Sequence, residues 1–192
     1  MPSLDDRLYE LDFAIQRSIR YHSRRRAFFD RCSSLGDALA VVFSSATVAS
    51  LLNQTATDLA PWFAAVVTVV AALNLVVGSA RMARTHHDLA RRFIALEAEI
   101  AVVVEPDEAN YRRWVAARLA IEAEEPPVLR VLDTICHNDV LRAMGFDPSY
   151  AIPVGPVQRR LAHFCDFREH ALKQAQYPEP EESPAAVPGA QG

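Results

Sequence analysis

Two short combinations of thiols and imidazoles are the residues in this chain best suited to chemistry. Cys136 is followed directly by His137, and His163 precedes Cys165 by two positions. Both side-chain types bind zinc, but structural zinc sites space their ligands in patterns such as C-x2-C and H-x3-H. The side chains of adjacent residues reach a single ion poorly, so we expect no metal site. Helices that bury the cysteines and leave the histidines in solvent are the simpler interpretation.

Catalysis has no better support. A nucleophilic cysteine needs a base and an oxyanion site, and no pattern marks either one beside Cys136 or Cys165. The six glycines never cluster into a phosphate-binding loop. His86 and His87 could respond to pH, although basic residues at a membrane interface explain them more simply. We therefore expect no catalytic residue, no cofactor and no enzyme activity.

Two long apolar segments without charged residues are the structural elements that would position any other functional group. Residues 38–57 and 59–80 contain no charged residue, and only Asp58 separates them. Twenty helical residues rise about 30 Å, the thickness of a bilayer's hydrocarbon core, so membrane helices are predicted at about 35–53 and 61–80. The loop between the runs carries no Lys or Arg, which places both termini on the cytoplasmic side. The arginines expected to anchor lipid headgroups at the outer ends are Arg24, Arg25, Arg26, Arg81 and Arg84.

Polar side chains interrupt both runs. In an antiparallel pair, Asp37 would lie level with Arg81. Ser44 and Ser45 would then lie level with Asn74, about 10 Å into the membrane. An amide at that depth needs a hydrogen-bonding partner because lipid offers none, so we expect it to bond one of the serines or a second copy of the chain. These groups either hold the hairpin together or line a water-filled path in an oligomer. The candidates for that path are Ser44, Ser45, Thr47, Ser50, Thr68 and Asn74.

Apolar residues also recur at helical spacing outside the two runs. One seam precedes the first run and another follows the second, with steps of three and four residues. The two seams lie at equal chain distance from the hairpin, so they should meet as an antiparallel cytoplasmic stalk. The alternative is that each seam packs on some other neighbouring helix. Ser3 and Asp6 form a capping-box pattern, and neither Pro nor Gly interrupts residues 3 to 35. The seam residues are Leu4, Leu8, Leu11 and Ile15, then Leu89, Phe93, Leu96, Ile100 and Val103.

The rest of the chain is predicted to be helical, followed by a tail. A helix should follow Pro106, and two more are expected over about 128–144, closed by Gly145, and 157–174. Together the predictions give an all-α fold. Residues 3–125 form a two-helix transmembrane hairpin with long cytoplasmic helical extensions. Residues 126–176 form a small C-terminal helical region, and residues 177–192 form a disordered tail rich in Pro and Glu.

The composition of the chain restricts the classes of partner that we expect it to bind. The net charge of −4 gives no overall bias toward nucleic acid, and the arginine run 24–26 lies beside an apolar span, which favours lipid headgroups over RNA. Three widely spaced cysteines do not form a disulfide framework. The acidic N-terminus is unlike a secretory signal peptide. The soluble alternative buries both apolar helices in a bundle, but the remaining helices are rich in charge and cover them poorly.

The juxtamembrane sequence resembles a known family. The run from Tyr21 to Phe29, Tyr-His-Ser-Arg-Arg-Arg-Ala-Phe-Phe, precedes the hairpin, and Arg81 and a heptad helix follow it. This arrangement over about residues 8 to 125 is similar to the SLATT domains, two-transmembrane effector modules of bacterial conflict systems. The resemblance implies an effector of the bacterial inner membrane that forms pores or disturbs the bilayer. It also implies a separate partner that senses or synthesises a nucleotide signal, because no sensor domain is recognisable in this chain.

The leading hypothesis is a homo-oligomeric, pore-forming effector in anti-phage defence. Two alternatives remain from other classes of protein. A non-conducting membrane scaffold would recruit a cytosolic partner through its C-terminal helices. A soluble helical regulator would be recovered in the soluble fraction of cells without detergent.

Overall fold

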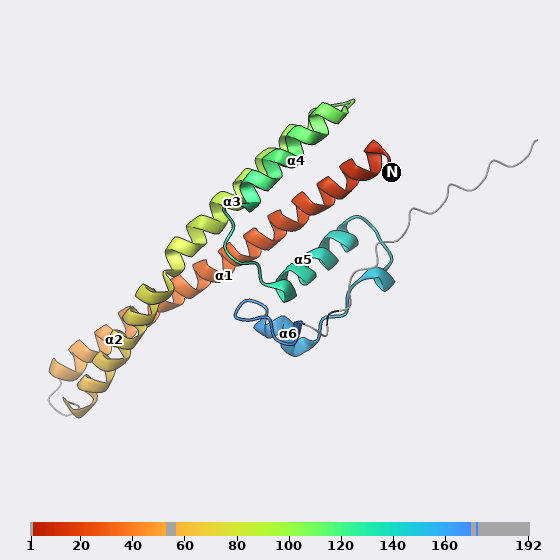
Figure 1. Cartoon of the computed structure of the whole chain (residues 1–192). Helices are drawn as coiled ribbons and strands as arrows, with labels where there is room; N and C mark the ends of the chain where they lie inside the picture. The colour runs from red at the N-terminus through yellow and green to blue at the C-terminus, as the bar shows by residue number, and fades with distance from the viewer. Residues whose placement is uncertain (1, 53–56, 170–171, 173–192) are drawn as a thin grey trace, which may run out of the picture. The chain divides into compact units, whose positions relative to one another are not determined.

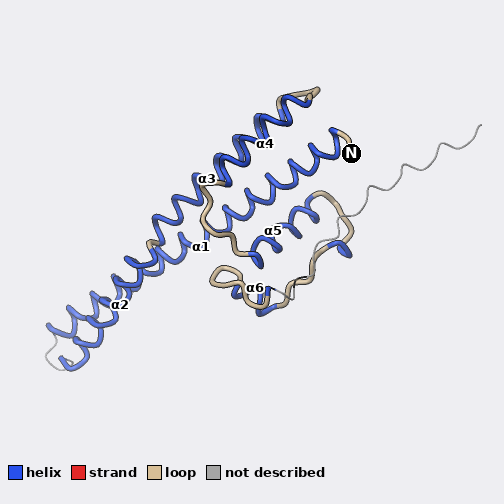
Figure 2. The backbone as a smooth tube through the Cα atoms, viewed as in Figure 1, coloured by secondary structure: helices blue, strands red, loops and turns tan. Residues whose placement is uncertain are grey.

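The computed structural model describes residues 2–52, 57–169 and 172, apart from the side chains at positions 57, 74, 75 and 77. These residues form helices and loops and contain no strand, so the fold is all-α (Figure 2). They divide into two compact units, residues 1–129 and residues 130–192, each of which is described by itself. The boundary lies four residues beyond the predicted end of the hairpin region. The predicted tail at 177–192 lies outside the described residues.

The first unit is built on one 49-residue helix, α1 (Leu4–Leu52). Ser3 caps its start: the Ser3 Oγ accepts from the Asp6 backbone N–H at 3.1 Å, and the Asp6 carboxylate accepts from the Ser3 backbone N–H at 2.9 Å. This reciprocal pair satisfies backbone donors that the first helical turn would otherwise leave unpaired. The helix continues through Gly36 into the first apolar run.

The chain then turns back along α1. A short 3-10 turn, η1 (Thr57–Leu59), leads into α2 (Ala60–Val77) and then α3 (Ser79–Ala101). Both helices pack antiparallel to α1, α2 against its C-terminal part and α3 against its N-terminal part (Figure 1). The predicted helix 61–80 is therefore not continuous. Gly78, at φ 59° and ψ 40°, breaks it just before the charged stalk begins.

The break requires glycine, which gives a direct test. A φ of +59° costs an L-residue with a Cβ about 1–2 kcal/mol, whereas Asn tolerates this region better. We expect Gly78→Ala to lower the melting temperature of the detergent-solubilised chain by several degrees. Gly78→Asn should lower it less. Equal melting temperatures for wild type and the alanine variant would contradict the left-handed assignment.

The two seams meet in the core of the first unit. Leu11 and Ile15 pack with Leu89, Phe93 and Leu96 in a single buried cluster. Leu8, Ile100 and Val103 pack against it as partly buried residues, and Leu4, also partly buried, lies outside the cluster. Trp114 and Ile121 complete the cluster from a third helix, α4 (Glu108–Glu122), which runs back along α3. We call this arrangement of α1, α3 and α4 the stalk.

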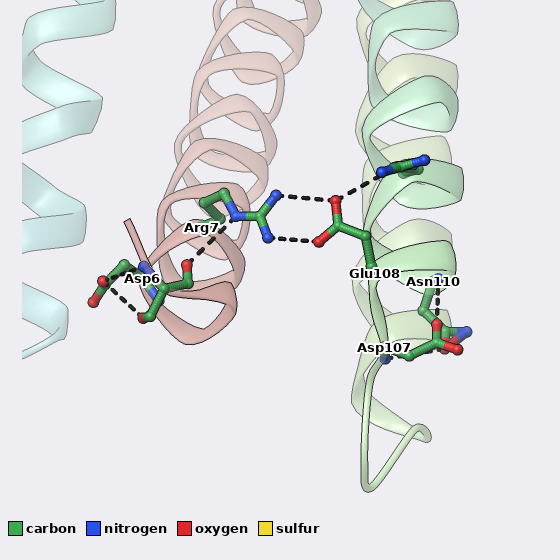
Figure 3. Close-up of polar contacts among 7 residues, drawn as sticks. Asp6, Arg7, Asp107, Glu108 and Asn110 are labelled. Atoms are coloured by element: carbon green, nitrogen blue, oxygen red, sulfur yellow. Dashed lines mark hydrogen bonds and ion pairs between the residues drawn. The ribbon is translucent and has the colours of Figure 1, made fainter. Parts of the chain in front are cut away.

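Polar contacts fix the end of the stalk that is furthest from the apolar hairpin. Arg7 of α1 makes two hydrogen bonds to the Glu108 carboxylate, at 3.1 and 2.5 Å, and Arg112 contacts the same group (Figure 3). Asp107 and Asn110 form a capping box at the start of α4. A bidentate pair of this kind sets the register of α4 against α1.

The second unit contains α5 (Arg130–Ala143), a 3-10 turn η2 (Pro148–Tyr150) and α6 (Pro156–Leu161). Gly145, at φ 82°, ends α5, and the Phe146 N–H donates to the Leu141 carbonyl as in a Schellman motif. Asn138 exchanges two hydrogen bonds with the backbone of Ile152 and so holds the proline-rich loop. The predicted final helix at 157–174 was too long: the α-helix ends at Leu161.

Candidate functional site

The apolar parts of α1 and α2 each turn one narrow stripe toward the other helix. On α1, Phe43, Ala46, Thr47 and Ser50 are partly or fully buried, at the spacing of one helix face. The matching stripe on α2 is Ala60, Phe63, Val67 and Val70. Phe43 and Phe63 touch, with ring centroids 6.0 Å apart.

The opposite faces of the same helices are exposed and apolar. No other described part of the first unit covers them. On α1 the exposed side chains include Val48 at 57% and Leu52 at 80%, and on α2 Trp62 at 72% and Val76 at 84%. Soluble monomers rarely expose a contiguous apolar surface of this extent, and such surfaces mark contact with lipid or with another protein. The further exposed members are Val41, Val42, Leu51, Val66, Val69 and Leu73.

Length and composition identify one described helix that could cross a membrane. Helix α1 contains an 18-residue window with a mean hydropathy of 1.7, and only 11% of that window is buried inside the chain. The described apolar part of α2, Ala60–Leu73, is shorter than a span. By this criterion, the described residues contain one of the two predicted membrane-spanning helices, and α2 does not qualify as the second.

The register of the two helices differs from the predicted one. Phe43 contacts Phe63, so Ser44 and Ser45 lie level with the start of α2. Asn74 is 11 residues beyond Phe63, roughly 16 Å further along the helix, so it is not level with the two serines. Its side chain lies outside the described residues. Asp37 likewise lies beside α2 and not beside Arg81. The prediction placed the turn at Asp58, whereas α1 already ends at Leu52.

The polar candidates for a water-filled path do not share one surface. Ser44, Ser45 and Thr68 lie on exposed faces, whereas Thr47 and Ser50 belong to the stripe between the helices. Three hydroxyls bond within their own helices, Ser45 to the Val41 carbonyl, Thr47 to that of Phe43 and Thr68 to that of Ala64. A hydroxyl that donates to its own helix can enter lipid without a partner on another helix.

Arginines from both sides of the hairpin lie at one level of the stalk. His22 of α1 contacts His86 of α3, and the two helices are antiparallel. The positions just after His22 therefore lie level with the positions just before His86. This register brings the predicted headgroup anchors Arg24 and Arg26 level with Arg81 and Arg84. These four side chains are exposed. Arg25 differs from them because its guanidinium stacks over the Phe29 ring at 4.5 Å, and burial lowers its pKa.

A buried histidine pair lies inside the stalk, on the side of these arginines that faces away from the apolar hairpin. His22 and His86 are each 1% exposed, and their Nδ1 atoms are 2.9 Å apart. The Nε2 of His22 lies 2.9 Å from the Glu125 carboxylate. Phe93 stacks on His22 and Phe29 stacks on His86, at 5.7 Å in both cases. The two imidazoles are thus enclosed between aromatic rings.

The hydrogen-bonding rules restrict the protonation of this pair. A carboxylate only accepts, so the His22 Nε2 carries a proton and donates to Glu125. When His22 is neutral, its Nδ1 accepts from the His86 Nδ1–H. The remaining nitrogen of His86, Nε2, is then a buried acceptor, and no partner for it is found in the described part of the chain. We call His22, His86 and Glu125 the histidine relay.

The relay ties a connecting segment to the stalk. Residues 123–129, which follow α4, make three polar contacts with α1 and α3. Arg92 binds the Glu124 carboxylate at 2.6 and 3.0 Å, and His22 binds Glu125. The Tyr21 hydroxyl accepts from the Leu129 backbone N–H at 3.0 Å. We call residues 123–129 the strap. It is the segment through which the second unit is joined to the first.

The relay predicts a pH-dependent stability. Burial, His22 and Arg25 lower the pKa of His86 from 6.5 to about 4. The unfolded chain therefore binds more protons between pH 6.5 and 4, so folding stability falls as the pH falls through this window. The loss should approach about 3 kcal/mol near pH 4. Thermal melts of the detergent-solubilised chain across this range measure it.

A variant isolates the contribution of His86. Asp12 and Glu97, which face each other across the stalk, have raised carboxyl pKa values because of burial, and they act in the opposite direction at low pH. The amide of His86→Gln can still donate to the His22 Nδ1 but does not titrate. Its stability should vary less between pH 6.5 and 4 than that of the wild type. Identical pH profiles would show that the buried imidazole does not set the slope.

The cysteine and histidine pairs of the second unit do not form a ligand cluster. Cys136 is fully buried, but His137 is also buried at 6%, so the expectation of a solvent-exposed histidine was wrong there. His163 is partly buried and Cys165 is exposed. No group of three potential metal ligands occurs among the residues that the structure describes.

Sequence reasoning missed the histidine relay, although a signal was present. The first seam continues from Ile15 by seven residues to His22, and the second seam extends back from Leu89 by three residues to His86. Extending the first seam by seven residues and the second by three, both toward the hairpin, would have predicted that the histidines face each other. Nothing in the sequence indicates that Glu125 folds back to meet them.

The comparisons with known proteins do not add an identity. No family model matches the chain, and neither a curated protein nor a solved structure matches it.

Proposed function

We propose that this protein is a membrane effector whose apolar hairpin, formed by α1 from residue 35 onward and by α2, enters the lipid bilayer of a bacterial inner membrane. One observation carries the proposal: the apolar window of α1 is only 11% buried, and the facing α2 leaves its outer side uncovered. A helix that is apolar all round and unburied by its own chain is stable only in lipid or against another protein. The basic residues below the hairpin, and the absence of Lys and Arg above it, favour lipid with both termini in the cytoplasm.

The length of the hairpin sets how it would lie in the bilayer. The uncharged part of α1 that is described, residues 38–52, rises roughly 22 Å, which is less than a 30 Å hydrocarbon core. A short span thins the bilayer locally or makes its flanking charged side chains extend to the headgroups. Asp37, which lies beside apolar α2, would be such a side chain. Local thinning is itself a route to leakage, which supports a permeabilising role.

Oligomers of the chain would conduct ions across the membrane, and the strap would control this conduction. Exposed Ser44, Ser45 and Thr68 lie on the outer faces, where a second copy of the chain would meet them. The strap joins the stalk to the second unit, so a partner bound to the second unit could alter the stalk through Glu125. The resemblance to SLATT domains supports the same role, with a separate protein supplying a nucleotide-derived signal. None of these steps needs a catalytic residue.

Leakage measurements test the proposal. Full-length protein reconstituted in vesicles should release an entrapped dye, and induced expression should collapse the membrane potential of cells. Ser44→Leu with Ser45→Leu and Thr68→Leu should reduce the leak at equal protein incorporation. Equal leakage by this variant would reject the polar lining. Incorporation without any leak would favour the alternative role, a non-conducting scaffold that recruits a cytosolic partner.

A further inference from the structure

A cationic groove lies on the side of the stalk between α1 and α3. Ser23, Arg26 and Asp30 line it from α1, and His87 and Arg91 line it from α3. Ala27 and Ala90, whose small side chains leave the space open, and Ile94 complete its lining. None of these side chains belongs to the histidine relay, which is buried on the inner side of the same two helices.

The hydrogen-bonding state of the groove follows from the Arg26–His87 contact. The Arg26 Nη1 lies 3.0 Å from the His87 Nδ1. A guanidinium has no acceptor, so this His87 nitrogen must accept the bond. In the neutral imidazole the proton is then on Nε2, which becomes a donor. The contact therefore orients His87 and determines which of its nitrogens can donate to a ligand.

The groove presents more donors than its own residues use. Arg91 has no ion-pair or hydrogen-bond partner in the described part of the chain, and the same is true of the Ser23 hydroxyl. Arg26 contacts Asp30, but its Nε lies 3.4 Å from the carboxylate, which is a loose pair between two half-exposed side chains. Two guanidiniums, a hydroxyl and an imidazole N–H face a single carboxylate. The chemistry that matches this set is a multiply charged oxyanion.

We propose that this groove binds a phosphate monoester. Such a group carries close to two negative charges at neutral pH and offers three strong acceptor oxygens. Arg26 and Arg91, one from each helix, supply forked donors on the two sides of the anion, and Ser23 and His87 complete its coordination. A bound anion would bridge α1 and α3 and so stabilise the stalk. The proposal does not require the hairpin to lie in lipid.

The phosphate can come from a soluble metabolite or from a lipid. His87 is seven residues from Ala80, the end of the uncharged run, which is roughly 10 Å along α3. A lipid headgroup reaches this level only if the bilayer covers α2 and the start of α3 down to Ala80. A soluble phosphate monoester reaches the groove in either case. The two sources share their binding chemistry and are separated by experiment.

Calorimetric titration of the full chain in a nonionic detergent tests the proposal. The soluble probe is glycerol 3-phosphate, and the lipid probe is phosphatidic acid in mixed micelles, with phosphatidylcholine as its reference. We expect heat from at least one phosphate monoester and none from phosphatidylcholine. Binding of glycerol 3-phosphate identifies a soluble ligand, and binding of phosphatidic acid alone identifies a lipid. The absence of binding by both probes would overturn the proposal.

Four variants connect the binding to the groove. Arg91→Gln should weaken binding tenfold or more, whereas Arg112→Gln, which removes an exposed arginine from α4, should leave it within twofold. Asp30→Asn removes the one opposing charge and should tighten binding severalfold. Ala27→Leu adds bulk to the lining of the groove without changing its charge and should weaken binding. If Arg91→Gln and Ala27→Leu bind as the wild type does, the groove is not the site, whatever the hairpin does in membranes.

Discussion

Two arginines on the outer faces of the hairpin should remove the protein from the membrane. Val48 and Val69 lie near the middle of the two uncharged runs and are 57% and 58% exposed. An arginine costs up to about 3 kcal/mol to insert, the maximum applying at the centre of a membrane helix, so Val48→Arg with Val69→Arg should cost at most about 6 kcal/mol. We expect the wild type in the carbonate-resistant membrane fraction of cells and the double variant outside it.

The same substitution elsewhere gives the control. Ala95 and Ala98 lie on the exposed face of α3 in the stalk. Ala95→Arg with Ala98→Arg adds the same charge to a surface in water and should leave the protein in the membrane. In a water-soluble protein, arginine at the exposed positions 48 and 69 would be tolerated as well. Retention of the hairpin double variant in the same fraction as the wild type would therefore argue against insertion.

Truncation of His22 should produce the largest loss of stability in the stalk. His22→Ala removes a fully buried ring that stacks on Phe93 and leaves both Glu125 and the His86 Nδ1 without their partner. A buried cavity together with unpaired polar groups costs roughly 3–5 kcal/mol. The melting temperature of the detergent-solubilised chain should fall by about 10 °C or more. Near-ultraviolet circular dichroism of Trp114, which lies in the stalk core, follows the transition.

Three further variants separate the polar contacts of the relay from simple packing. His87→Ala changes the neighbouring histidine, which is only partly buried, and should cost less than about 1 kcal/mol. Glu125→Gln keeps an oxygen that accepts from the His22 Nε2 and should also cost little, whereas Glu125→Ala removes that acceptor. Equal losses for His22→Ala and His87→Ala would mean that the buried pair makes no special contribution.

Periodicity predicted the stalk because the relevant side chains are local in the sequence. The steps from Leu11 to Ile15 and from Leu89 to Phe93 and Leu96 fix which face of each helix is apolar, and a chain reversal between them brings the faces together. Helix start signals were equally local. Ser3 with Asp6 and Asp107 with Asn110 form capping boxes within a single turn.

The register of the hairpin and the strap depend on interactions distant in the sequence. Asp58 separates the uncharged runs, but α1 stops at Leu52, and this difference moves the whole of α2 along α1. Composition does not determine where a helix ends inside an apolar run that lacks Pro and Gly. The contact of Glu125 with His22 joins residues 103 positions apart, and no spacing rule covers such a contact. The prediction of a helix over 157–174 was wrong about where the helix ends. The apolar spacing continues beyond Leu161, so it does not mark the end of the helix there.

Tryptophan fluorescence tests the lipid location of the hairpin most directly. The chain has two tryptophans, Trp62 on the exposed face of α2 and Trp114 buried in the stalk. The variants Trp114→Phe and Trp62→Phe each leave one of them, and vesicles of brominated phosphatidylcholine quench only a ring that lies in lipid. We predict strong quenching of Trp62 and none of Trp114. Emission from Trp62 that is the same in brominated and ordinary vesicles would contradict a membrane-embedded hairpin.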